Sequence, residues 1–168
     1  MADRISTLEA ELVRHGANDA RRARRFHGLM AAALGLDEEQ WQPWEDELGH
    51  ACDVEQALSS LADLADAAPE TVRGMVADPH QARRLVRVLG GSAELGKYLT
   101  AHPDALDVLA AEPEQWSAEQ IRTDLLSCVS AIEQDGFLVS QADPARGADE
   151  LRLANRRHLL RIAARDLS

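Results

Sequence analysis

Apolar side chains recur every three or four residues along most of the chain, and this helical periodicity is the feature that most constrains the fold. Ile5, Leu8 and Leu12 form a first stripe, which Gly16 stops. No stretch alternates convincingly between apolar and polar residues, as a half-buried strand would. The pattern predicts an all-α protein, an irregular bundle of about eight to ten short helices.

Capping residues mark where several of these helices begin. Asn18 or Asp19 precedes a second helix, and Asp53 precedes a strongly apolar one. Ser117 followed by Gln120 has the spacing of a capping box, in which each side chain bonds to the other residue's backbone N–H. These positions predict helix starts independently of the apolar pattern.

The C-terminal third is expected to hold two further helices. The helix that starts at Ser117 has apolar positions through Ile132, residues 140–147 form a loop, and a final helix runs from about Ala148. That helix has no glycine or proline at its end, which is typical of a cut in a longer chain. We therefore expect residues 1–168 to be a single helical domain or the N-terminal segment of a larger protein.

Composition excludes several classes of function. The chain has 168 residues, 45% of them hydrophobic, and a formal net charge of −11. An acidic chain is a poor general nucleic-acid binder, because binding to phosphates needs basic surface. No run of about 18 apolar residues exists, so no membrane span is predicted. Two widely separated cysteines form no framework, so a reducing, cytoplasmic setting is the simplest expectation.

The negative charge is concentrated in one block. Residues 1–30 hold six arginines against four acids, residues 31–81 hold one base against twelve acids, and residues 82–168 hold eleven bases against thirteen acids. The block 31–81 is either a set of solvated helical faces or an acidic patch for a basic partner. We expect its acids to face solvent or a partner, so that neutralising them leaves the fold intact.

One glycine-rich stretch invites comparison with phosphate sites. Gly90-Gly91-Ser92 precedes a predicted helix, and free amide groups at a helix start can bind phosphate. The lysine of a P-loop is absent, however, and Asp104 and Asp107 are spaced D-x-x-D on a predicted helix. We interpret the glycines as a helix exit and the serine as an N-cap.

No other group of residues predicts chemistry. The six histidines form no HExxH pair, and His50 with Cys52 would supply only two metal ligands. Neither Cys52 nor Cys128 has neighbours that would lower a thiol pKa. The sequence therefore predicts no catalytic, cofactor-binding or metal-binding residue in this chain.

The arginines of the last predicted helix are candidates for an interface. Arg157, Arg161 and Arg165 recur at intervals of four, and Arg156 lies in a second row with Arg152. Repeated like charges at this spacing mildly destabilise an isolated helix, so these side chains are expected to meet acidic surface. The acids belong either to this chain or to another part of a larger protein.

Three stretches together resemble one protein family. The stretch Leu85–Gly96, continuing to His102-Pro103, resembles the segment LLxVLGaSxxLgxxLxxHP of bacterial glutamine-synthetase adenylyltransferases. Residues 151–167 look like their segment LRxxxRRxLLRIAARDL, and the stretch from Ala51 onward is similar to aaDPxxALxxLaxL. The three stretches occur in the same order and with the same spacing as in the family. The likeness covers about residues 50–168, has an actinobacterial form and is looser over residues 1–50.

The resemblance implies a large bifunctional enzyme with two nucleotidyltransferase halves. One half attaches AMP from ATP to a tyrosine of glutamine synthetase, and the N-terminal half removes it by phosphorolysis. A PII-type signalling protein and glutamine set the balance, which controls nitrogen assimilation. Both halves depend on Mg²⁺ held by a Gly-Ser and Asp-x-Asp constellation.

In the family, that constellation of the first half follows the RIAARDL helix, and this chain stops before it. No catalytic residue of the family can be carried onto a position here, so we expect a non-catalytic segment for domain packing or partner contact. Two other interpretations stay open: a free-standing helical interaction module, and a small-ligand sensor built on the bundle.

Overall fold

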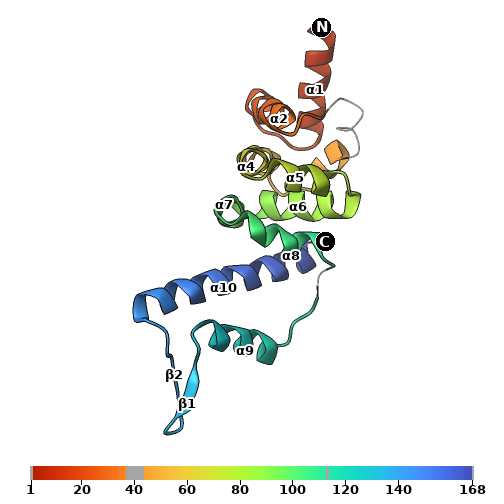
Figure 1. Ribbon diagram of the computed structural model, residues 1–168. Coiled ribbons are helices and arrows are strands. Elements are labelled where there is room, and N and C mark those ends of the chain that lie inside the picture. The colour runs from red at the N-terminus through yellow and green to blue at the C-terminus, as the bar shows by residue number, and fades with distance from the viewer. Residues whose placement is uncertain (1, 37–43, 113, 168) are drawn as a thin grey trace.

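The helices stack in layers from the N-terminus downward, and a long helix with a small hairpin closes the far end (Figure 1). The computed structural model describes residues 2–36, 44–112 and 114–167, with side chains from Leu8 onward. Its elements are α1 (Ala2–Arg14), α2 (Ala20–Leu34), α4 (Val54–Ala67), α5 (Pro69–Val76), α6 (Pro79–Gly91), α7 (Ala93–Ala101), the 3-10 helix η1 (Pro103–Leu106), α8 (Asp107–Ala110), α9 (Ala118–Cys128), β1 (Ile132–Gln134), β2 (Phe137–Val139) and α10 (Pro144–Asp166). Residues 44–48 are also helical. The predicted all-α bundle is confirmed.

Side-chain caps hold the helix starts where the sequence placed them. Asp19 and Asp53 each accept a hydrogen bond from the backbone N–H three residues further on. Ser117 and Gln120 make both bonds of the predicted capping box. Each cap satisfies a backbone donor that the helix leaves unpaired, and stabilises its helix by about 1 kcal/mol.

The core lies around α4, which contacts α2, α5, α6 and α7. The apolar residues of α4 are buried, with Leu58 and Leu61 fully shielded from solvent. Burial of each such leucine stabilises the fold by about 1.5–3 kcal/mol. Trp44 and Leu48 are fully buried as well, while Trp41 and the side chain of Ile5 lie outside the described residues.

A β-hairpin forms where the sequence analysis expected only helix and loop, so that prediction is wrong for residues 132–139. β1 and β2 pair antiparallel, with Ile132 opposite Val139 and Gln134 opposite Phe137. The turn residues Asp135 and Gly136 have φ angles of 53° and 80°, the left-handed conformation that closes a two-residue hairpin. The Asp-Gly pair was the signal that helical periodicity obscured.

The flanking helices shift accordingly. α9 ends at Cys128 instead of continuing through Ile132, and α10 begins at Pro144 instead of near Ala148. Asp143 caps α10 by accepting bonds from two backbone N–H groups, and Pro144 suits the first turn, where its missing N–H costs nothing. The predicted loop 140–147 is therefore shorter than expected.

The glycines before Ser92 are not a left-handed helix exit. Gly90 and Gly91 lie inside α6, and Ser92 has an extended backbone between α6 and α7. A Cβ on Gly90 would come within 2.8 Å of the Ala51 Cβ and 3.0 Å of the Asp53 carbonyl oxygen. Gly90 is required by close packing. Ser92 caps α7, as predicted, by accepting from the Leu95 N–H.

The acidic block is only partly a solvated surface. Glu47 is 6% exposed and accepts two hydrogen bonds from the Arg83 guanidinium, at 2.8 and 2.9 Å. Asp53 and Asp78 cap α4 and α6. The expectation that acids of the block face solvent is therefore wrong for Glu47, because its helix packs against α6 and brings the carboxylate to Arg83.

In the described part of the chain, no helix combines the length and apolar character needed to cross a membrane.

Candidate functional site

The helix α10 carries the four arginines that the sequence assigned to an interface. It contacts α6, α7 and α8 on one side and α9 on another. Leu160 and Ala164 are fully buried in these contacts. The helix therefore joins the main bundle to the α9 segment, and its arginines point into different surroundings.

Two of the arginines are engaged within the chain. Arg157 donates to the carboxylate of Asp107 at 2.6 Å, which ties α10 to α8. The Arg161 guanidinium lies 4.3 Å from the centre of the Trp116 ring, a cation–π geometry, and Nη1 lies 3.2 Å from His158 Nδ1. These two side chains position α10 against its neighbours.

The other two arginines face solvent. Arg165 makes an ion pair only with the adjacent Asp166 among the pairs of described residues, and both side chains are substantially exposed. Arg156 is exposed and close enough to Glu94 to lower that carboxyl's pKa, although the hydrogen bond from Lys97 contributes more. Arg156, near the middle of α10, and Arg165, at its C-terminal end, thus remain accessible charges.

A polar cluster centred on His158 was not found by sequence reasoning. His158 is 3% exposed, its Nε2 lies 2.8 Å from Asp124 Oδ2, and its ring packs 5.4 Å from that of Trp116. Because the Arg161 guanidinium can only donate, Nδ1 accepts from it and Nε2–H donates to Asp124. The cluster holds α9, which has no fully buried residue, against α10. No local pattern links residues so distant in sequence.

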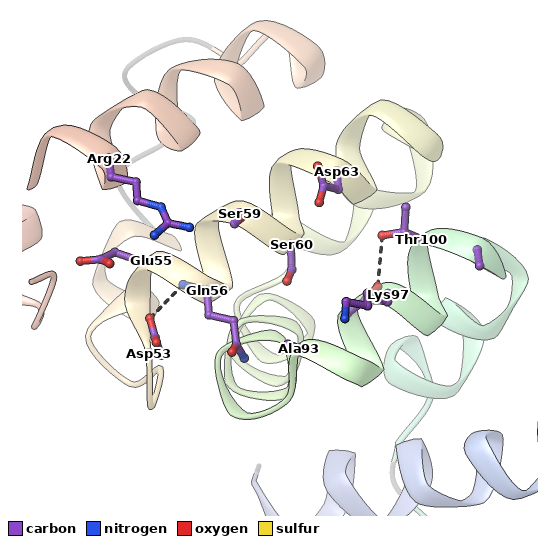
Figure 2. A pocket seen from close by; sticks show the side chains of 12 residues that line it. Arg22, Asp53, Glu55, Gln56, Ser59, Ser60, Asp63, Ala93, Lys97 and Thr100 are labelled. Carbon is purple, nitrogen blue, oxygen red and sulfur yellow. Dashed lines mark hydrogen bonds between the residues drawn. The ribbon is translucent and has the colours of Figure 1, made fainter. Parts of the chain in front are cut away.

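An open groove of about 540 Å³ lies between α2, α4 and α7 (Figure 2). Positively and negatively charged side chains line the groove: Arg22 and Lys97 lie there together with Asp53, Glu55 and Asp63. The lining residues are Arg22, Asp53, Glu55, Gln56, Ser59, Ser60, Asp63, Ala93, Gly96, Lys97, Thr100 and Ala101.

Several polar groups of the groove are engaged in bonds within or between the helices. Asp53 caps α4, and Gln56 donates to the Leu89 carbonyl oxygen at 2.8 Å. Lys97 pairs with Glu94. Thr100 bonds back to the Gly96 carbonyl (Figure 2). These bonds engage only part of the polar lining, to which Arg22, Ser59, Ser60 and Asp63 also contribute. We assign no ligand to the groove.

The residues present do not fit the metal of a nucleotidyltransferase. Asp107 bonds to Arg157 and lies, with Asp104, on the short turns η1 and α8. The described residues contain no group of three or more His, Cys, Asp or Glu side chains placed to hold a metal ion. We assign no step of nucleotidyl transfer to this chain.

The thiol of Cys128 is poorly suited to act as a nucleophile. Burial, followed by the charges of Asp124 and Glu150, raises its pKa above the ordinary value. A raised pKa lowers the fraction of reactive thiolate at neutral pH.

Comparison with known proteins identifies relatives of one kind. The chain is 39% identical over 99% of its length to the bifunctional glutamine synthetase adenylyltransferase/adenylyl-removing enzyme of Cutibacterium acnes. Enzymes of the same name from Bifidobacterium longum subsp. infantis and Streptomyces avermitilis are 32% and 31% identical over 94% and 98% of this chain. No family model matches the chain. No solved structure matches it.

The match covers only a small part of those enzymes. The chain spans 17% of the Cutibacterium acnes protein and 15% of each of the other two. The aligned region includes nearly every residue of this chain. The chain is therefore homologous, along almost its entire length, to one segment of the bifunctional glutamine synthetase adenylyltransferase/adenylyl-removing enzymes of the actinobacterial type.

Proposed function

We propose that this chain is a helical segment of an enzyme that adenylylates and deadenylylates glutamine synthetase. The observation that carries the proposal is the 39% identity to the Cutibacterium acnes enzyme over 99% of the chain. The parent enzyme would use ATP and Mg²⁺, act in the cytoplasm on glutamine synthetase, respond to a PII-type signalling protein and thereby control nitrogen assimilation.

The role of the segment within that enzyme is non-catalytic. Among the described carboxylates, Asp53 caps a helix, Glu47 forms an ion pair and Asp63 is exposed at the surface. We propose that it acts in domain packing or partner contact, with Arg156 and Arg165 meeting acidic groups outside the chain. Arg157 and Arg161 would set the position of α10 from within.

The reading frame of the gene tests this function against a free-standing interaction module. A frame that continues past the codon for Ser168 into Gly-Ser and Asp-x-Asp, with strand-forming residues around them, is the expected result. A stop codon directly after Ser168 would favour the module and contradict the proposal.

A further inference from the structure

The end of the molecule built from α9, the hairpin and α10 exposes an unusual share of apolar surface. Among the described residues, seven of the nine large apolar side chains that are exposed lie between residues 132 and 162. They are Ile132, Phe137, Leu138, Val139, Leu151, Leu159 and Ile162. We refer to these seven residues as the apolar arm. Single exposed apolar residues are ordinary, but a concentration of them is typical of an interaction surface.

The hairpin lacks a packing face of its own. Every residue of β1 and β2 is exposed, and Phe137 is 73% exposed. Because side chains alternate along a strand, the run Phe137–Val139 places apolar groups on both faces of the ribbon. A two-stranded hairpin that packs on nothing is marginally stable in water, and its edges are open to pairing. The local Asp-Gly turn shapes the ribbon, but another surface is needed to hold it.

The side of α10 that is turned away from the main bundle, and that the α9 segment partly covers, continues the same character. At 3.6 residues per turn, Leu151, Leu159 and Ile162 project within about a quarter of a turn of one another. Leu160 and Ala164, which pack on the main bundle, lie on the opposite side of the helix. α10 is therefore apolar on a side that the described residues leave between 38% and 49% exposed.

We propose that the apolar arm is the docking site for the rest of the parent polypeptide, that is, for enzyme sequence outside the homologous segment. This inference rests on the proposed function. The relatives extend far beyond the segment, since the chain spans only 15–17% of their length. Interfaces that never separate are more apolar than transient ones, which suits a contact within one chain better than a contact with a substrate protein.

Hydrogen exchange on two proteins tests the docking directly. The amide exchange of residues 132–139 and 151–162 is measured in this chain and in the polypeptide encoded by the complete reading frame. Docking predicts exchange at least about tenfold slower in the longer polypeptide, independent of protein concentration. The variant Phe137→Ser in the longer polypeptide should lose that protection at residues 132–139. The matched control Leu29→Ser, which alters an exposed leucine on α2, should keep it.

Three results would overturn the proposal. Equal exchange in the two proteins would show that the rest of the polypeptide leaves the arm uncovered. Protection that grows with the concentration of this chain alone would assign the arm to a second copy. Protection that appears only after addition of glutamine synthetase would assign it to the substrate protein.

The same preparations separate this inference from the proposed function. The longer polypeptide could release AMP from adenylylated glutamine synthetase and yet exchange its amides at residues 132–139 as fast as this chain does. That result would support the proposed function and contradict the docking. A reading frame that ends at Ser168 contradicts both, because no further polypeptide would exist to dock.

Discussion

At the residue scale, Glu47 shows that an acid in a strongly acidic block can be a buried structural residue. Its carboxylate accepts two hydrogen bonds from the Arg83 guanidinium. These hydrogen bonds hold the pKa of the Glu47 carboxyl below its ordinary value. Replacing it by Glu47→Gln should lower the free energy of unfolding at pH 7 by about 1–2 kcal/mol, since a charge-assisted bond is lost. Denaturant titration of both proteins measures the difference.

The pH dependence of that difference has a definite sign. Because folding lowers the pKa of Glu47, its contribution is present above the unfolded value of about 4.3 and is lost as the pH falls through the lower folded value. The gap between wild type and Glu47→Gln should therefore shrink in acid. The neighbouring Asp46→Asn, at an exposed position, should change stability by less than about 0.5 kcal/mol. Equal effects of the two substitutions would show that the Arg83 pair contributes nothing.

At the scale of single elements, Gly90 fixes how closely α6 approaches the start of α4. Alanine normally stabilises a helix relative to glycine, by about 1 kcal/mol. At Gly90 the new methyl would overlap Ala51 and the Asp53 carbonyl, so Gly90→Ala should instead destabilise the protein by about 1–3 kcal/mol. Gly28→Ala on α2, where nothing lies within 4 Å of the added Cβ, should be stabilising. The melting temperatures of both variants, measured by thermal unfolding, test this prediction. A Gly90→Ala variant more stable than the wild type would contradict the close contact.

The attachment of α9 to α10 depends on His158. Removing the ring in His158→Ala takes away the bond to Asp124 and the contact with Trp116. Amide exchange across Ala118–Cys128 should accelerate by an amount equivalent to about 1–3 kcal/mol, while α4 keeps its protection. Arg152→Ala, which removes an exposed pair with Asp149, should leave α9 unchanged. Unaltered exchange in α9 after His158→Ala would show that other contacts hold it.

Local signals explain which elements could be predicted and which could not. Asp53, Ser92 and Ser117 act within one turn of their own helix, so their sequence neighbours are enough to predict those helix starts. The hairpin differs from the prediction because the apolar spacing around it favours a helix, whereas the Asp-Gly pair at residues 135–136 closes a two-residue turn. The cluster of His158 with Asp124, 34 residues away, needed the tertiary structure, since nothing in either neighbourhood specifies the partner.

At the scale of the whole molecule, the core and the candidate surfaces lie at different places. The buried leucines gather around α4, whereas the apolar arm belongs to the hairpin and α10, at the other end of the molecule from α1 (Figure 1). The net charge of −11 comes from residues 31–81, yet some of those acids stabilise the bundle from within. A helical scaffold that presents one apolar end fits a segment whose task is contact with other parts of an enzyme.

The central proposal is that this chain is a segment of a glutamine-synthetase-modifying enzyme and performs none of its chemistry. The most direct measurement is AMP release from adenylylated glutamine synthetase in the presence of Mg²⁺ and phosphate. We expect release by the polypeptide of the complete reading frame, and no release above the buffer control by residues 1–168 alone. Turnover by the isolated chain, or an inactive complete polypeptide that is folded, would contradict it.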